Sequence, residues 1–215
     1  MNGNHLKKLL EELCTKLEIN LNEEQKNKFI LYLETLKKWN RIHNLTAVEK
    51  DEEIIKRHFC DSLSLVKFFR EIGYNPRGKS LVDVGSGAGF PGVPLKIYYG
   101  DSLEVHLIES VSKKCSFLSY LKTKLGLDYT VHCQMAQEVE LKCHIAVSRA
   151  LEVKGKKIHP LDYAYRLLDK FATELIVIMK GQKIEESWLK KYDFKVYNLQ
   201  IKDLFSSKIL FKFKN

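Results

Sequence analysis

The chain has 215 residues, of which 45% are hydrophobic and 29% are charged, a composition that is ordinary for a soluble globular protein with a substantial core. No uncharged apolar run approaches the length of a transmembrane helix, and residues 1–5 lack the apolar core of a signal peptide, so we expect a cytoplasmic protein. The 36 Lys and Arg residues exceed the 27 Asp and Glu residues, and the net charge of +9 favours a polyanionic partner.

Hydrophobic periodicity predicts three helices in the first third of the chain. Apolar residues recur at helical spacing in each, and Asn22 with Gln25 three residues on forms a plausible capping box for the second. A turn-rich stretch, residues 73–78, follows the third helix. The predicted helices cover about residues 6–17, 23–39 and 51–70. We expect a helical cap at 1–78 and a second domain at 79–215.

Beyond residue 78, short apolar runs alternate with helical segments, which predicts an α/β fold with a mostly parallel sheet covered on both faces. The expected strands are 80–84, 103–109, 129–133, 144–148 and 174–179. The expected helices are 91–99, 111–125, 160–171 and 183–191. Two further strands, 194–201 and 208–214, follow without a helix between them. In the last, lysines alternate with apolar residues, which suits an antiparallel strand at an edge of the sheet.

Cysteines and histidines show no metal-binding pattern. The cysteines include no Cys-x-x-Cys pair and their number is odd, so we expect reduced structural thiols at Cys14, Cys60, Cys115, Cys133 and Cys143. The seven histidines are scattered and form no His-Glu-x-x-His motif. We therefore predict no metal site.

A glycine-rich loop follows the first expected strand, in the run Leu-Val-Asp-Val-Gly-Ser-Gly-Ala-Gly-Phe-Pro-Gly at residues 81–92. Ligands of open parallel sheets bind beyond the carboxyl ends of the strands, where glycine allows close backbone approach. Two registers are possible: Gly85-x-Gly87-x-Gly89, or Gly87-x-Gly89-x-x-Gly92, which is the dinucleotide fingerprint. A glycine-rich turn that holds no ligand is the third possibility.

Glu109 lies at the end of the second expected strand, about 20 residues after the glycine loop. A carboxylate at this place can accept hydrogen bonds from both hydroxyls of a ribose. Alternatively, Glu109 is an acid near a helix N-terminus that faces solvent. The spacing favours a nucleoside-like ligand.

Asp83, placed before Gly-x-Gly, is typical of S-adenosylmethionine (SAM) methyltransferases, and the longer string Val84–Leu95 closely resembles the cofactor loop of one family. That family is the bacterial small-subunit (16S) rRNA guanine-N7 methyltransferases, RsmG or GidB. Further segments resemble its signatures: Lys38-Trp39-Asn40, Asn44-Leu45-Thr46-Ala47, Arg57-His58-Phe59, Asp61-Ser62-Leu63, Val147-Ser148-Arg149-Ala150 and Met179-Lys180-Gly181. The similarity runs from about residue 36 to 186.

The resemblance implies a Rossmann-like, seven-stranded SAM-dependent methyltransferase fold with an N-terminal helical cap, acting on N7 of one guanine in 16S rRNA. The cofactor is then SAM, and the partner is 16S rRNA or the small ribosomal subunit. Separately, we expect the protein to be a monomer. The family's cofactor contacts fall on Gly85, Phe90, Ala136, Gln137 and Arg149. Gln137 departs from the family, which usually carries an acid there, and residues 151–159 fit it only loosely.

Reasoning from the residues adds Asp83, Gly87, Gly89 and Glu109 to the candidate cofactor contacts. Asp83 or loop carbonyls can face the SAM ammonium, although Asp83 can equally fix the loop by accepting its N–H groups. For the substrate we expect contacts from Asn44, Arg57, His58 and Lys180. The alternative roles are a turn or cap residue for Asn44, a packing residue for His58, and surface charges on loops for Lys180 and for Arg149.

No catalytic dyad is expected for this chemistry. Guanine N7 presents a lone pair and carries no proton, so methyl transfer needs alignment and exclusion of water but no general base. Two other functions compete with this one. A nicotinamide-dependent oxidoreductase is compatible with the second glycine register and Glu109, and a non-catalytic RNA-binding module is compatible with the basic charge.

Overall fold

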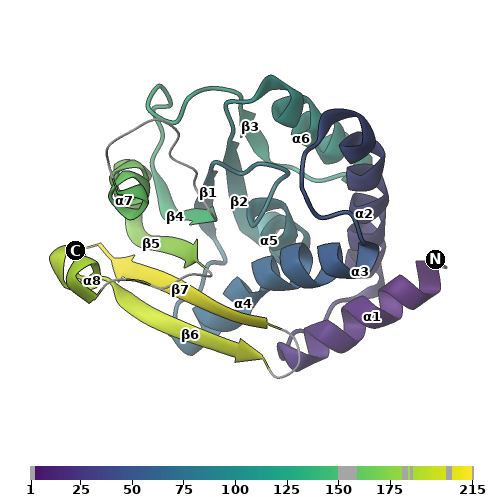
Figure 1. Cartoon of the computed structure of the whole chain (residues 1–215), viewed down its shortest axis with the longest axis horizontal. Coiled ribbons are helices and arrows are strands. Elements are labelled where there is room, and N and C mark those ends of the chain that lie inside the picture. The colour runs from purple at the N-terminus through teal and green to yellow at the C-terminus, as the bar shows by residue number, and fades with distance from the viewer. Residues whose placement is uncertain (1–2, 150–158, 181–183, 185, 202–204, 215) are drawn as a thin grey trace.

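Seven strands form one sheet in the computed structural model, which describes residues 3–149, 159–180, 184, 186–201 and 205–214 (Figure 1). The strands are β1 (Lys79–Val84), β2 (Leu103–Ile108), β3 (Thr130–His132), β4 (Cys143–Arg149), β5 (Ala172–Lys180), β6 (Lys195–Ile201) and β7 (Phe205–Phe213). Their order across the sheet is β3-β2-β1-β4-β5-β7-β6. The first five strands pair in parallel, whereas β7 is antiparallel to both β5 and β6. The predicted fold class, with an antiparallel C-terminal strand, is confirmed.

The prediction that the last strand lies at an edge is wrong. β7 is inserted between β5 and β6, so β6 is the edge strand. Ile209 and Leu210 of β7 are both fully buried, although they point to opposite faces of the sheet. The alternation of lysines led to the wrong prediction because we expected the Lys212 position to be exposed. Its side chain instead extends and donates to the carbonyl of Tyr192 at 2.8 Å.

Helices cover both faces of the sheet, as predicted (Figure 1). They are α1 (Gly3–Lys16), α2 (Glu23–His43), α3 (Asp51–Ile54), the π-helix η1 (Ile55–Cys60), α4 (Asp61–Glu71), α5 (Gly92–Tyr99), the 3₁₀-helix η2 (Gly100–Ser102), α6 (Ser112–Leu125), α7 (Pro160–Phe171) and α8 (Glu186–Tyr192). α1 to α6 contribute to the core on one face, and α7 and α8 to the core on the other. Strand residues alternate between the two cores; in β5, Leu175 and Val177 face the first, and Ile176 and Ile178 the second.

Local sequence signals explain how the N-terminal helices begin and join. Asn22 caps α2 with a complete capping box: its side chain accepts from the Gln25 N–H, and the Gln25 side chain accepts from the Asn22 N–H. Residues 51–71 form one continuous helical stretch, as predicted, but residues 55–60 within it form the π-helix η1. Such π segments occur frequently at functional sites, and η1 contains Arg57 and His58.

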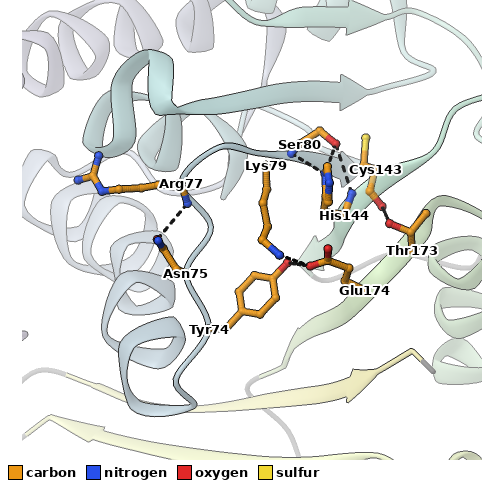
Figure 2. Close-up of polar contacts among 9 residues, drawn as sticks. All are labelled: Tyr74, Asn75, Arg77, Lys79, Ser80, Cys143, His144, Thr173 and Glu174. Carbon is orange, nitrogen blue, oxygen red and sulfur yellow. Dashed lines mark hydrogen bonds and ion pairs between the residues drawn. The ribbon is translucent and has the colours of Figure 1, made fainter.

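The amino-terminal ends of the central strands are joined by polar side chains (Figure 2). Glu174 of β5 accepts from the Tyr74 hydroxyl at 2.8 Å and forms an ion pair with Lys79 of β1. Beside this group, the Ser80 N–H donates to His144 Nδ1 at 3.0 Å. These bonds extend the short β1–β4 ladder, which pairs only residues 81–83 with 145–147. They fix the turn before β1 to the sheet.

The expectation of five reduced thiols is wrong for one pair. Cys115, in the first turn of α6, forms a disulfide with Cys133, which directly follows β3; the two Cα atoms are 5.7 Å apart. No sequence motif indicates this pairing, because only the packing of α6 beside β3 brings the two positions together. Cys14, Cys60 and Cys143 are buried free thiols.

Among the described residues, no helix is both long and apolar enough to cross a membrane. Within the same part of the chain, no group of three or more His, Cys, Asp or Glu side chains is arranged to hold a metal ion.

Candidate cofactor site

The carboxyl ends of the parallel strands bring most of the predicted site residues to one edge of the sheet. β1 is followed by Gly85, β2 by Glu109, and β4 ends at Arg149. β1 lies between β2 and β4, so chain progression reverses direction across the sheet at this point, and a ligand crevice forms there in such folds. Lys180 ends β5 at the same edge, but its side chain is outside the part that the structure describes.

The glycine loop is held tightly by backbone bonds yet leaves space above one glycine. The N–H groups of Gly85 and Ser86 both donate to the carbonyl of Ile108, at 2.9 and 3.1 Å. Gly85, Gly87 and Gly89 all have positive φ. A Cβ on Gly87 would meet only the Gly85 carbonyl, at 4.0 Å, so a side chain there would start in open space.

Gly92 has a different role, in packing. A Cβ at this position would lie 2.4 Å from Leu107 Cδ2 and 3.0 Å from Asp83 Oδ2. Glycine is required because α5 begins here against β1 and β2. Gly92 therefore shapes the helix and faces the interior of the protein.

Asp83 is fully buried beneath the loop, and one of its oxygens has no partner. Oδ2 accepts from the Gly92 N–H at 2.8 Å, whereas Oδ1 makes no hydrogen bond. Burial raises the pKa of Asp83 to about 7, against the lowering effects of the Gly92 N–H and of Arg149. The buried Ser86 hydroxyl also has no partner. Two unsatisfied buried polar atoms fit a ligand that carries a cationic or hydrogen-bonding group.

Glu109 is buried, so the interpretation of a solvent-facing acid is wrong. Its Oε2 accepts from the Gly87 N–H and its Oε1 from the Val111 N–H, both at 2.9 Å. The carboxylate thus braces the glycine loop against the loop after β2, a role that the sequence did not reveal. An ionised carboxylate has further lone pairs, so these two bonds leave it able to accept from a ribose.

Ala136 and Gln137 lie in a turn that follows β3. Ala136 packs against the second core, while Gln137 is exposed and donates through Nε2 to the Tyr163 hydroxyl at 2.6 Å. The Gln137 carbonyl accepts from Lys170 Nζ at 2.9 Å. The amide therefore ties this turn to α7 by donating a bond that a carboxylate could not donate.

Arg149 joins the N-terminal helices to the sheet through a group that we name the Arg149 cluster: His58, Asp61, Phe90 and Arg149. Arg149 Nη1 lies 3.2 Å from Asp61 Oδ2, and Nη2 lies 2.9 Å from His58 Nδ1. The guanidinium also lies over the Phe90 ring, with Cζ 5.2 Å from the ring centroid. The sequence predicted three of these residues as contacts of cofactor or substrate, but not their mutual contacts. In the sequence analysis Asp61 appeared only within Asp61-Ser62-Leu63, a segment that resembles a family signature, and no role was predicted for it.

His58 is neutral in this cluster. Burial and the neighbouring Arg149 lower its pKa to about 4. Arg149 can only donate, so His58 Nδ1 accepts from it at 2.9 Å, and Nε2 carries the proton that is donated to Thr46 Oγ1 at 3.0 Å. In this tautomer the Arg57 carbonyl, 3.2 Å from Nδ1, is a neighbour of that nitrogen without being its hydrogen-bond partner. The imidazole also stacks on Phe90, with 4.7 Å between ring centroids. Phe90 is sandwiched on its other side by Tyr32, so its ring is not an open stacking surface.

Of the remaining substrate candidates, Arg57 reaches this cluster through its backbone carbonyl. The Arg57 side chain is 70% exposed and pairs with Glu53 at 2.7 Å, although its carbonyl accepts from Arg149 at 3.1 Å. Asn44 is exposed and ends α2 in a left-handed conformation (φ 49°), which is the cap role considered for it. Residues 150–158, which contain most of the loosely matching stretch 151–159, are outside the described residues.

The fold and the glycine-loop site define a class, the SAM-dependent methyltransferases with a Rossmann-like sheet. Magnesium protoporphyrin IX methyltransferase from Synechocystis PCC 6803, solved with bound SAM, is similar with a TM-score of 0.61 at 16% identity; the match covers 91% of this chain and 99% of that chain. The family model for rRNA small subunit methyltransferase G, GidB, matches residues 25–210. The chain belongs to this family.

Two relatives support the assignment over nearly the whole chain. Ribosomal RNA small subunit methyltransferase G of Aquifex aeolicus (strain VF5) is 48% identical over 208 residues, which are 95% of this chain and 99% of that protein. The protein of the same name from Acetivibrio thermocellus is 35% identical over 206 residues, covering 93% and 81%. The cofactor is accordingly SAM, and neither the nicotinamide oxidoreductase nor the non-catalytic module is favoured.

Proposed function

We propose that this enzyme transfers the methyl group of SAM to N7 of one guanine in 16S rRNA, within the small ribosomal subunit or its RNA. The observation that carries the proposal is the 48% identity to a named small-subunit rRNA methyltransferase across 95% of the chain. The guanine N7 position comes from the resemblance of the sequence motifs. The net charge of +9 suits an RNA substrate.

SAM supplies a methyl group on a sulfonium centre, and the chain supplies its orientation. We place the amino-acid end of SAM at the glycine loop, where Asp83 Oδ1 and Ser86 Oγ lack partners and Gly87 leaves open space. Glu109 then accepts from the ribose, and Ala136 and Gln137 border the adenine. Gly85, Gly89, Phe90 and Arg149 complete the proposed cofactor site.

The protonation states of the site agree with a reaction that needs no general base. His58 is neutral and its only ring proton is donated to Thr46. Arg149 is always cationic and donates to Asp61 and His58. Neither group has to remove a proton, because guanine N7 carries none. Positioning in a site that excludes water then supplies the rate enhancement.

We propose that the guanine binds beside the Arg149 cluster, where the N-terminal helices meet the carboxyl end of β4. Arg57, Asn44 and Lys180 are the proposed contacts of the surrounding RNA. We further propose a monomer in the cytoplasm. Sedimentation equilibrium that gives a mass near 25.1 kDa would support the monomer.

The direct test incubates protein, labelled SAM and 16S rRNA, free or in small subunits, and maps the label. A 7-methylguanine, recognised by chain cleavage after borohydride and aniline treatment, is the expected product. Gly87→Asp should abolish labelling, because the new side chain occupies the open space above the loop. Gly73→Asp is the matched control: Gly73 has a similar φ of +69° and empty surroundings, but it lies in the turn before β1, at the opposite end of that strand from the glycine loop.

The proposal fails if label enters another atom or another class of RNA. It also fails if Gly87→Asp and Gly73→Asp are equally active. Calorimetry gives an independent check, since SAM should bind to the protein and NAD should not.

A further inference from the structure

Two neighbouring helix segments carry cations and no acids. Residues 35–43 of α2 contain Lys37, Lys38 and Arg41, and α6 contains four lysines, but neither segment contains an aspartate or glutamate. α2 and α6 pack together beside the glycine loop (Figure 1). The contact is close, because a Cβ on Gly89 would touch both Tyr32 of α2 and Leu118 of α6.

Most of these cations have no ion-pair partner in the part of the chain that the structure describes. Lys37 pairs with Asp51, and Lys122 pairs with Asp128. The other five make no ion pair with any residue that the structure describes. We name these five the basic face: Lys38, Arg41, Lys113, Lys114 and Lys124. By contrast, many lysines elsewhere are paired, including Lys26, Lys67 and Lys170.

Aromatic side chains join the two halves of the basic face. Trp39 of α2 lies against Tyr120 of α6, with 5.5 Å between ring centroids, and Tyr120 is still 47% exposed. On α6, Lys113, Tyr120 and Lys124 are spaced by seven and four residues, so they form one stripe along the helix. That stripe is about 16 Å long at 1.5 Å per residue. An exposed ring is thus flanked by cations on both sides.

The basic face begins at the cofactor site. α6 starts at Ser112, three residues after Glu109, and Lys113 and Lys114 lie in its first turn. The positive end of the helix dipole disfavours cations in a first turn, where acids are preferred. α6 also has no side-chain cap, since its N-cap residue is Val111. Residues that destabilise the start of a helix and lie next to a binding site indicate selection for function.

We infer that the basic face is the surface on which the rRNA strand lies as its guanine enters the site. The phosphates contact Lys38, Arg41, Lys113, Lys114 and Lys124, and a base stacks on Tyr120. The inference rests on the proposed rRNA substrate and identifies the surface that binds it. An RNA strand fits better than an acidic protein, because an exposed ring between cations is the arrangement that binds stacked bases and their backbone together.

The test is the salt dependence of binding to a 16S rRNA fragment. Each lost phosphate contact lowers the slope of log K against log salt by about 0.7 to 0.9. The double variant Lys113→Gln/Lys124→Gln should therefore lower the slope by about 1.4 to 1.8. Tyr120→Leu keeps an apolar contact with Trp39 but loses stacking, and should weaken binding at least about fivefold at every salt concentration.

The matched control is Lys190→Gln/Lys195→Gln, which removes two exposed lysines of α8 and β6, far from α6 (Figure 1). Its slope and affinity should equal those of the wild type. SAM affinity, measured by calorimetry, should be unchanged in all three variants, which shows that the fold is intact. If Lys113→Gln/Lys124→Gln binds rRNA with the wild-type slope, the inference is wrong.

Two further outcomes separate this inference from the proposed function. If the wild type neither binds nor methylates rRNA, the proposed function itself fails. If the double variant binds free rRNA normally but loses affinity for assembled small subunits, the basic face contacts ribosomal protein, and the assignment to RNA is overturned.

Discussion

At the scale of single residues, Asp83 has the most unusual environment in the site. It is fully buried, and only one of its oxygens is hydrogen-bonded. A carboxylate that is unpaired in the interior is costly, and its pKa of about 7 reflects that cost. Arg149 offsets part of it, and Glu109 adds to it. The SAM ammonium, placed at Oδ1, would remove it.

This environment makes SAM affinity depend on pH. The folded pKa of about 7 lies above the ordinary value of 3.8, so the free protein holds a proton on Asp83 below pH 7. That proton must leave before the carboxylate pairs with the ammonium. We therefore expect SAM affinity to rise from pH 6 to pH 8, by up to about tenfold per unit below the pKa, in calorimetric titrations.

Two controls isolate the role of Asp83. Asp83→Asn should bind SAM weakly and without this pH dependence. Methylthioadenosine has no ammonium group, so its affinity for the wild type should not change over the same range. An unchanged pH slope in Asp83→Asn would assign the effect to another group.

Sequence motifs located the site well, but they did not reveal its internal bonds. Gly85, Glu109 and Arg149 follow or end parallel strands, and strand ends are predictable from apolar runs. The bonds from Gly87 to Glu109 and from Arg149 to His58 join residues 22 and 91 positions apart. Such contacts depend on tertiary packing, which local patterns do not encode.

At the scale of elements, prediction succeeded where the pattern was local and repeated. The capping box of α2 and the strands β1 to β5 were located within a few residues. The π-helix η1 was missed because helical periodicity does not distinguish it from its neighbours. The interior position of β7 was missed because the alternation of lysines shows only which side chains are charged. It does not show how far the apolar part of a lysine side chain can extend to bring its ammonium group to a partner, as at Lys212.

The ion pair of Arg149 with Asp61 links α4 to β4. Both side chains are less than 20% exposed. Asp61→Asn removes the countercharge, so we expect a loss of about 2 kcal/mol in the free energy of unfolding, measured in urea. SAM affinity should fall as well, because Arg149 loses its orientation.

The matched control is Glu53→Gln, which breaks the exposed pair with Arg57 on the neighbouring helical turn. Exposed pairs contribute little, so the expected loss is below about 1 kcal/mol. A double-mutant cycle of Asp61→Asn with Arg149→Gln should show coupling. Additive effects would mean that the pair does not link the two elements.

At the scale of the whole molecule, the N-terminal helices and the sheet share one core. Phe29, Phe59 and Phe68 belong to the same buried cluster as Leu81 of β1 and Val177 of β5. The boundary that we propose between residues 78 and 79 therefore separates an all-helical part of the chain from a part that contains the strands. It does not separate two cores. We propose that the two parts nevertheless fold together.

The two tryptophans of the chain test this directly. Trp39 packs on the first core and Trp188 in the second. In Trp188→Phe the fluorescence reports the helical part, and in Trp39→Phe it reports the C-terminal part. We expect each variant's urea transition by fluorescence to coincide with its own transition by circular dichroism. Separate transitions would show that the cap unfolds independently.

The interior position of β7 has a consequence for the order in which the sheet is assembled. β6 precedes β7 along the chain, yet β7 lies between β5 and β6. The sheet therefore cannot grow by adding strands in the order of synthesis. The simplest route forms β6 and β7 first as a local antiparallel pair, which then docks through β7 onto β5. Until it docks, one side of β5 is an open hydrogen-bonding edge, and a nascent chain at this stage is most exposed to aggregation.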